Sequence, residues 1–313
     1  MVWKVLVCDP VEVEGTQRLR SAGFEVDERP TISSEELLKV VGGYDALLIR
    51  GRTKVTSDVI QAGRRLKAIV RAGVGLDNVD VEFAKKAGIQ VTSTPAALTV
   101  SVAELTIGLI LDVLRQISFA DRNMKEGKWI KSRLTGRELR GKTVGVIGAG
   151  GRIGSEVARI LKAGFGANVV AYDIVDISRY AAGLGMQLAK DLEDLLACSD
   201  IVTVHVPYSE ATHHLLNDRK IAAMKKGSIL INTSRGDVVD GQALLKALKE
   251  KHLSGAGLDV FHSEPPKEEW EKELVSLQDG VAVCTCHIGA QTIEGQRAAS
   301  VMASETLVKL LKP

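Results

Sequence analysis

Apolar and polar residues alternate along this chain in short blocks of two kinds. Some blocks are brief apolar runs rich in β-branched residues and bounded by turn residues, which is typical of strands buried on both faces. The blocks between them have apolar residues at helical spacing. Strands that alternate with helices over short connections predict a parallel sheet wrapped by helices.

The first 95 residues or so form one such series. Ser33, followed by Glu35 and Glu36, has the composition of a capped helix start. Gly23 and Gly88 are expected to end helices. The predicted strands are 2–8, 24–26, 45–49, 67–71 and 89–91, and the predicted helices are 11–22, one opening at Ser33, 57–62 and 79–87.

Thr94-Pro95 interrupts this series, and a second α/β series follows. A long helix is predicted over 99–126, then a loop marked by Gly127, Trp129 and Gly136. Six strands are the number in a complete dinucleotide-binding fold. They are predicted at 143–147, 168–172, 201–204, 228–232, 255–260 and 281–284, with helices at 192–197, 240–249, 268–274 and 293–311.

Composition and net charge argue against several classes of partner and site. The chain has 313 residues, enough for two domains, and a net charge of +2, which gives no reason to expect a nucleic-acid or acidic-membrane partner. The longest apolar run, 102–114, contains Glu104 and Asp112, so no membrane span is expected. The four cysteines lack zinc or redox spacing; although Cys284-x-Cys286-His287 resembles a ligand set, we expect no metal site and a reduced, cytoplasmic protein.

A glycine-rich turn joins the strand at 143–147 to a helix. Gly148, Gly150, Gly151 and Gly154 bring the backbone close to whatever lies at the helix N-terminus, which attracts a pyrophosphate. The spacing is one residue longer than the common G-x-G-x-x-G, and we expect 155–161 to remain helical despite it. Asp173 ends the next strand, where a carboxylate binds the ribose hydroxyls of NAD and repels the phosphate of NADP. The sequence therefore predicts NAD binding.

Other polar residues follow the remaining strands, where ligands bind in doubly wound sheets. An arginine can grip a carboxylate bidentately, and a histidine can move a proton to or from an alcohol oxygen. The arginines and histidines at such positions are Arg50, Arg52, Arg71, His205, Arg235 and His287, and the carboxylates are Asp259 and Glu264. By contrast, His213, His214, His252 and His262 have no such context and are expected in solvent or loops.

The order of several motifs resembles the D-isomer-specific 2-hydroxyacid dehydrogenase family over the whole chain. The motifs are Ser234-Arg235-Gly236, Asp259-x4-Glu264-Pro265 and His287-x-Gly-Ala-x-Thr292, together with Val100-Ser-Val-Ala-Glu-Leu105 and Leu139-x-Gly-Lys-Thr143. Arg50-x-Arg52 and the segment 71–78 are most similar to the short D-3-phosphoglycerate dehydrogenases of that family. The proline at 95 is followed by Ala-Ala rather than the Gly-Asn of many members.

The resemblance implies a role for each matching residue. His287 would be the general acid and base with Glu264 as its partner, and Arg235 would bind the substrate carboxylate and polarise the carbonyl. Main-chain N–H groups of Val74 and Gly75 would also bind that carboxylate, and Arg50 and Arg52 a phosphate. The cofactor residues would be Gly148, Gly150, Gly151, Arg152, Ile153, Asp173, His205, Pro207, Thr233 and Asp259.

It also implies an α/β fold of two doubly wound parallel-sheet domains. A Rossmann cofactor domain, 96–288, would be inserted into a flavodoxin-like substrate-binding domain made of 1–95 and 289–313. The last helix would then return to the first domain, and a homodimer would form through the cofactor domain.

The expected reaction is the NAD-dependent oxidation of D-3-phosphoglycerate to 3-phosphohydroxypyruvate in serine biosynthesis. A glyoxylate or hydroxypyruvate reductase would share every catalytic residue and differ only in the polar pocket. An NAD-sensing, dehydrogenase-like corepressor would keep much of the fold and site. The sequence shows no disordered tail or peptide-docking extension that would favour the third alternative.

Overall fold

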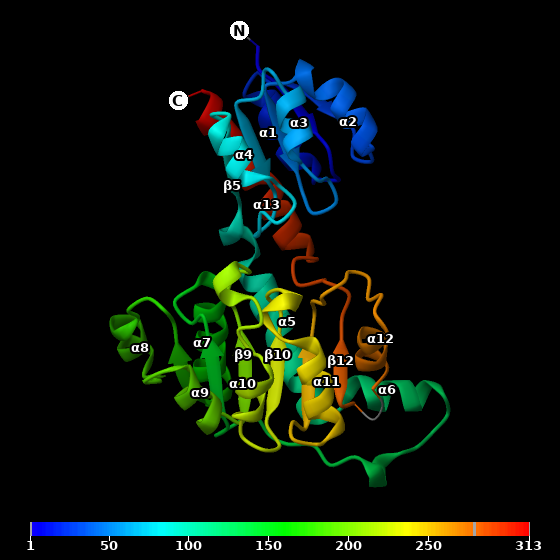
Figure 1. Cartoon of the computed structure of the whole chain (residues 1–313), viewed down its shortest axis with the longest axis vertical. Helices are drawn as coiled ribbons and strands as arrows, with labels where there is room; N and C mark the ends of the chain where they lie inside the picture. Colours follow the sequence, from blue (N-terminus) through cyan, green and yellow to red (C-terminus); the bar gives the residue numbers. More distant parts are fainter. Residues whose placement is uncertain (1, 278–279, 313) are drawn as a thin grey trace. The chain divides into compact units, whose positions relative to one another are not determined.

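Two parallel sheets, of five and seven strands, organise the chain (Figure 1). The structure is a computed structural model that describes residues 2–277 and 280–312. It has two compact units: a terminal unit, which runs to Ser101 and resumes at Ala290, and a central unit, Val102–Gly289. The sequence-based boundaries, 95/96 and 288/289, lie six residues and one residue from these divisions.

The terminal unit is built on the five-stranded sheet. Its strand order, β2-β1-β3-β4-β5, is the flavodoxin-like order expected from the sequence. Its elements are β1 (Lys4–Val7), α1 (Val13–Ser21), β2 (Glu25–Glu28), α2 (Ser34–Val40), β3 (Ala46–Ile49), α3 (Ser57–Ala62), β4 (Ala68–Arg71), α4 (Val81–Lys86), β5 (Gln90–Ser93) and α13 (Ile293–Leu311).

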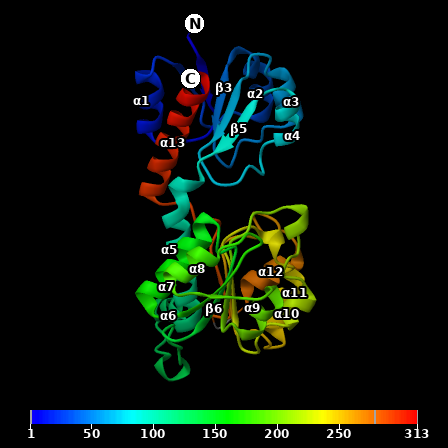
Figure 2. The same ribbon diagram turned by 90° about the vertical axis from the view of Figure 1, so that its left-hand side faces the viewer.

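Alternate residues of the buried strands β1, β3 and β4 face two apolar layers. In β1, Val5 and Val7 pack in the layer that contains residues of α1 and α13, whereas Leu6 and the next residue of this face, Cys8, pack in the layer of α2, α3 and α4. Figure 2 shows these helices on opposite sides of the sheet. The last helix of the chain therefore packs against the first, as the family resemblance implied. Ser33 caps the start of α2, as expected, and forms a capping box with Glu36.

The central unit is built on the seven-stranded sheet. Its order, β12-β11-β10-β9-β6-β7-β8, is the doubly wound dinucleotide-binding order with one further strand. The strands are β6 (Thr143–Ile147), β7 (Asn168–Tyr172), β8 (Gln187–Leu188), β9 (Ile201–Val204), β10 (Ile229–Asn232), β11 (Gly255–Leu258) and β12 (Ala282–Cys284). The helices are α5 (Thr99–Arg115), α6 (Ile117–Lys125), α7 (Arg152–Phe165), α8 (Ser178–Leu184), α9 (Leu192–Cys198), α10 (Asp218–Ala222), α11 (Gly241–Lys249) and α12 (Glu269–Ser276).

Two sequence predictions for this unit were wrong. The helix predicted over 99–126 is two helices, because Gln116 adopts a left-handed conformation (φ 54°) and the Asp112 carboxylate accepts a hydrogen bond from the Ser118 N–H, 2.8 Å away, in the first turn of α6. The six predicted strands are seven, since β8 is only two residues long and both are exposed. A strand this short carries no alternating pattern.

Helix α5 supplies a large part of the central core. The segment Pro95–Arg115 is long and apolar enough, by length and composition alone, to cross a membrane, yet 56% of its apolar window is buried within the protein. Ile107, Ile110 and Leu114 pack with strand residues such as Val144 and Ile229. The apolar character of this helix is thus explained by its place against the sheet.

Candidate active site

The glycine turn between β6 and α7 adopts the geometry of a dinucleotide-binding turn. Gly148 has φ +82°, and a Cβ on Gly154 would overlap the Gly148 carbonyl oxygen, so both positions require glycine. Helix α7 begins at Arg152 and includes 155–161, which confirms that the unusual spacing leaves this stretch helical. The Asp173 carboxylate, at the end of β7, accepts a hydrogen bond of 2.8 Å from the Gly150 N–H. The turn and the acid therefore form one site that fits the pyrophosphate and ribose of a dinucleotide.

Three further expected cofactor residues follow β9 and β10: His205 and Pro207 after β9, and Thr233 after β10. The ring of His205 hydrogen-bonds through Nε2 to the Thr203 hydroxyl (2.9 Å), and burial lowers the pKa of His205 from 6.5 to about 3. His205 is therefore neutral at physiological pH. Thr233 is buried, and its hydroxyl lies 2.9 Å from that of Thr106 on α5, whereas Pro207 is exposed.

Glu264 and His287 form a hydrogen-bonded acid–base pair. Nδ1 of His287 lies 2.6 Å from Oε2 of Glu264, and about two fifths of each side chain is exposed. Burial raises the pKa of Glu264, but the hydrogen bond and charge of His287, the hydrogen bond from the Phe261 N–H and the charge of Arg235 together more than offset this, so its pKa lies below 4.5. Because the carboxylate takes Nδ1, the opposite ring nitrogen, Nε2, is the one placed to exchange a proton with a ligand.

Asp259 fixes the segment that carries His287. Its buried carboxylate accepts hydrogen bonds from the Thr285 hydroxyl (2.6 Å) and from the N–H groups of Ile288 (2.8 Å) and Gly289 (2.9 Å). The His287 N–H also donates to the Asp259 carbonyl, and His287 itself has a left-handed backbone, φ +54°. A strained conformation of this kind persists only where surrounding contacts determine it.

Arg235 follows β10 on the same unit. Its Nη1 donates to the Ser234 carbonyl (2.6 Å), and the Asn232 side chain holds the Arg235 carbonyl (2.8 Å). Charge interaction with Arg235 also contributes to lowering the pKa of Glu264. All three residues expected to be catalytic thus lie on the central unit.

The terminal unit presents main-chain N–H groups after β4. The carbonyls of Gly73 and Val74 are held by the Thr94 N–H and the Ser93 hydroxyl, each at 2.8 Å. Because the peptide group is planar and trans, the N–H groups of Val74 and Gly75 point the opposite way. Adjacent main-chain N–H groups that point to one side are suited to bind an anion.

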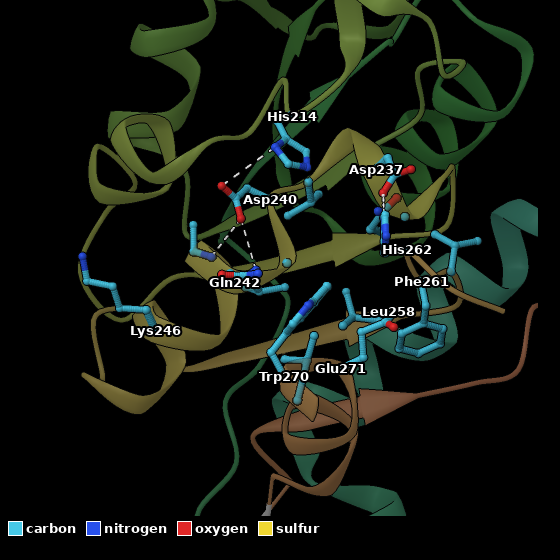
Figure 3. Close-up of a pocket in the computed structure, with 18 of the residues that line it drawn as sticks. His214, Asp237, Asp240, Gln242, Lys246, Leu258, Phe261, His262, Trp270 and Glu271 are labelled. Carbon is cyan, nitrogen blue, oxygen red and sulfur yellow. Dashed lines mark hydrogen bonds and ion pairs between the residues drawn. The ribbon is translucent and has the colours of Figure 1, made fainter. Parts of the chain in front are cut away.

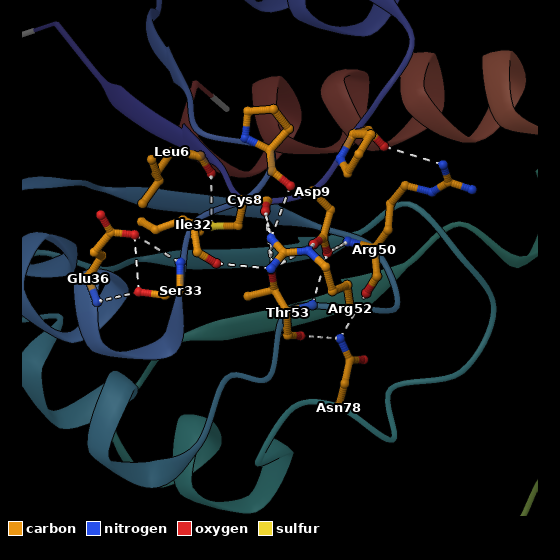
Figure 4. A network of polar contacts seen from close by, with 12 residues as sticks. Leu6, Cys8, Asp9, Ile32, Ser33, Glu36, Arg50, Arg52, Thr53 and Asn78 are labelled. Atoms are coloured by element: carbon orange, nitrogen blue, oxygen red, sulfur yellow. Dashed lines mark hydrogen bonds and ion pairs between the residues drawn. The ribbon is translucent and has the colours of Figure 1, made fainter. Parts of the chain in front are cut away.

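The two arginines after β3 differ in their engagement (Figure 4). Nε of Arg52 lies 3.1 Å from the Asp9 carboxylate, and its Nη atoms donate to the carbonyls of Ile32, Cys8 and Pro30. Arg50 donates through Nη1 to the Pro10 carbonyl and the Gln296 side chain at 3.3 and 3.2 Å. Arg52 is therefore built into the loop, and Arg50 is held by longer contacts.

Asp9 was missed by the sequence analysis. Its side chain is 1% exposed and also accepts from the Arg50 N–H (2.5 Å) and the Thr53 hydroxyl (2.7 Å). Asp9 could have been predicted from its position directly after the first strand, because the same criterion indicated Arg50 and Arg52.

A cavity of about 740 Å³ lies beside the segments that carry Arg235 and Glu264 (Figure 3). Its walls include four residues that hydrogen-bond or ion-pair in two couples: His262 with Asp237 (2.5 Å) and His214 with Asp240 (3.9 Å). His213 stacks on His214 with ring centroids 4.0 Å apart. These histidines lie in loops, as expected, but they are partnered.

A dinucleotide turn, an arginine and a histidine–carboxylate pair on one doubly wound unit define a nicotinamide-dependent dehydrogenase. Residues 107–289 match the family model of the NAD-binding domain of D-isomer-specific 2-hydroxyacid dehydrogenases. The chain therefore belongs to the D-isomer-specific 2-hydroxyacid dehydrogenase family, and its cofactor is NAD.

Individual relatives carry different substrate names. The chain is 42% identical to a D-3-phosphoglycerate dehydrogenase of Methanocaldococcus jannaschii over 99% of its own length and 57% of that protein. It is 43% identical to a hydroxypyruvate reductase of Thermotoga maritima, over 99% of this chain and 98% of that protein. A structure of D-lactate dehydrogenase from Aquifex aeolicus with NAD and lactic acid is 30% identical and has a TM-score of 0.84. The match covers 99% of this chain and 95% of that one. The chain thus spans little more than half of the phosphoglycerate dehydrogenase.

Proposed function

We propose that this protein oxidises D-3-phosphoglycerate to 3-phosphohydroxypyruvate with NAD, in the cytoplasm and as a step of serine biosynthesis. The observation that carries a dehydrogenase reaction is the 2.6 Å pair between His287 and Glu264. The phosphorylated substrate is supported by the 42% identity to phosphoglycerate dehydrogenases of two archaea.

In this proposal the residues of the site have distinct roles in catalysis and binding. Neutral His287 removes the hydroxyl proton through Nε2 while Glu264 holds Nδ1, which fixes the tautomer. Arg235 and the N–H groups of Val74 and Gly75 bind the substrate carboxylate and orient C2. Bound NAD supplies the hydride acceptor. Asp173 and the glycine turn bind its adenosine ribose and pyrophosphate, and His205, Pro207, Thr233 and Asp259 line its nicotinamide end.

The phosphate would be bound mainly by Arg50. The Arg52 guanidinium, which donates to three carbonyls and pairs with buried Asp9, would hold the loop rather than the ligand. This engagement favours a second candidate, reduction of hydroxypyruvate or glyoxylate, because it leaves fewer cationic donors for a phosphate. The 43% identity to a hydroxypyruvate reductase of nearly equal length supports the same candidate.

A substrate panel with an Arg50→Ala variant separates the two candidates. We expect NAD reduction to be fastest with D-3-phosphoglycerate, compared with D-glycerate, D-lactate and glycolate. Arg50→Ala should lower kcat/KM for the phosphorylated substrate by about 10- to 100-fold, because a charge-assisted hydrogen bond contributes about 1.5–3 kcal/mol. D-Glycerate, which lacks the phosphate, is the control and should change little.

Other outcomes identify the alternatives. Faster turnover of hydroxypyruvate or glyoxylate with NADH, unaffected by Arg50→Ala, would contradict the phosphoglycerate proposal and support the reductase. Binding of NADH in isothermal titration without turnover of any acid on the panel would favour the NAD-sensing corepressor.

We also propose a homodimer through the central unit. Ile117 and Met124 on α6 are each 54% exposed, and Trp129 just beyond it is 78% exposed. Apolar side chains gathered on one segment of a surface are typical of an interface. Size-exclusion chromatography with light scattering should give twice the chain mass at micromolar concentration, and Trp129→Glu should shift the protein toward one chain mass. A wild-type monomer would contradict this.

A further inference from the structure

The segments that carry Arg235 and Glu264 lie against each other in the central unit. A Cβ on Gly236 would overlap the carbonyl of Phe261, so the two backbones are in direct contact there. One residue further along each segment, Asp237 and His262 join through Oδ1 and Nδ1 at 2.5 Å. The ion pair therefore spans the contact between the two segments, two residues from Arg235 on one side and two from Glu264 on the other.

Each segment also has an anchor of its own. The Asp237 carbonyl accepts from the His214 N–H (2.8 Å), which ties the Arg235 segment to the loop before α10. The fully buried Glu271 carboxylate accepts from the N–H groups of Ser263 (2.7 Å), Lys267 and Glu268, which ties the Glu264 segment to α12. These anchors hold each segment to a different neighbour, whereas the His262–Asp237 pair connects the two segments directly to each other.

We propose that the His262–Asp237 pair is a positioning pair, which sets the distance between Arg235 and the Glu264–His287 pair and so tunes the rate of the reaction. The inference rests on the proposed catalytic roles of those three residues. Neither His262 nor Asp237 is expected to touch the substrate; both act through the backbone segments they join.

The pair responds to pH. The hydrogen bond to Asp237 raises the pKa of His262 above 6.5, against a smaller opposing effect of burial, and the charges of Glu271 and Glu268 raise it further. The other ionisable groups on the walls of the same cavity are His213, His214, Asp218, Asp240 and Lys246. A group with a raised folded pKa is charged below that pKa and loses its charge as pH rises through it. A charge-assisted hydrogen bond is about twice as strong as a neutral one, so the pair holds the segments most firmly on the acid side.

The variant His262→Gln tests this, because glutamine can still donate to Asp237 but cannot be charged. We expect kcat to fall about three- to tenfold at about pH 6, since small displacements of catalytic groups are costly, and the difference from wild type to disappear by about pH 9. KM for NAD should change little, because the glycine turn and Asp173, which would bind the pyrophosphate and the adenosine ribose, lie on other segments. His262→Gln combined with Asp237→Asn should be no slower than the slower single variant, as expected for one interaction.

The pair is exposed enough for these variants to fold. The side chains of His262 and Asp237 are 53% and 28% exposed, and an ion pair this exposed contributes little to the stability of the fold. Lys249–Glu273 is a matched control: this pair joins α11 to α12 at 2.6 Å with similar exposure and lies outside both segments. Lys249→Gln should leave kcat unchanged at both pH values.

His287→Gln in the same assay separates failure of this inference from failure of the proposed function. An active His287→Gln enzyme would overturn the proposed function and the positioning role with it. An inactive His287→Gln enzyme together with His262→Gln indistinguishable from wild type at both pH values, or slowed equally at both, would overturn the positioning pair alone. A pH-dependent loss confined to the His262 and Asp237 variants would support it.

Discussion

Replacing His287 by glutamine is expected to lower kcat about 1,000-fold with the best substrate of the panel, because proton transfer by a positioned side chain contributes about 10²–10⁴-fold. Glutamine can still hydrogen-bond to Glu264 across the 2.6 Å contact, but it cannot accept the substrate proton. NADH binding, followed by isothermal titration, should remain within about threefold of wild type, since the dinucleotide turn is formed by other segments. A kcat within about threefold of wild type would contradict the assignment.

Glu264→Gln provides the comparison for this variant. In the wild type, the pKa of Glu264 in the folded protein lies below 4.5. Above the unfolded value the Glu264 carboxylate is ionised and its pair with His287 is intact; the pair is lost as pH falls through the lower folded pKa. Glu264→Gln should therefore remove any acid limb that this protonation produces in kcat and lower the plateau about 10- to 100-fold. The variant that combines His287→Gln with Glu264→Gln should be no slower than His287→Gln alone, because the effects of substituting residues that act as a unit are not additive.

Most of the fold could be predicted because the strands are nearly continuous apolar runs. Strands β6, β7 and β9 and helices α3 and α13 begin and end where the sequence places them. The break in the helix after residue 115 could not be predicted, because it depends on a left-handed Gln116 and a side-chain hydrogen bond from Asp112, neither of which alters the helical spacing of apolar residues.

The residues of the candidate site were indicated by their places after strands, and the family resemblance paired His287 with Glu264, but the partners of the two arginines were not indicated. Arg50 and Arg52 are equivalent in sequence, two arginines after the same strand. Only the structure separates them, since Asp9 is 43 residues from Arg52 in the chain and meets it through the pairing of β1 with β3. In the same way, His262 gave no signal because its partner Asp237 lies 25 residues earlier.

The Arg52→Ala variant is expected to lower the stability of the terminal unit by about 2–4 kcal/mol, because it leaves the charge of the buried Asp9 carboxylate uncompensated. Asp9, 1% exposed, would keep its hydrogen bonds to the Arg50 N–H and Thr53 but lose the guanidinium that balances its charge. Three carbonyls, those of Cys8, Pro30 and Ile32, would lose a charged donor as well. In differential scanning calorimetry the transition that includes this unit should fall by roughly 10 °C.

Arg50→Ala is the matched control, since it removes the same charge from the same loop. Its side chain is held by two long contacts, at 3.2 and 3.3 Å, so the midpoint should fall by no more than about 3 °C. The two variants should therefore separate stability from binding: Arg52→Ala lowers the melting temperature and changes kcat/KM for D-3-phosphoglycerate and D-glycerate alike, whereas Arg50→Ala acts on the phosphorylated substrate alone. If Arg52→Ala instead left the melting temperature unchanged and raised KM only for the phosphorylated substrate, Arg52 would be a phosphate ligand. The carbonyls around it would then be contacts that it gives up when the substrate binds.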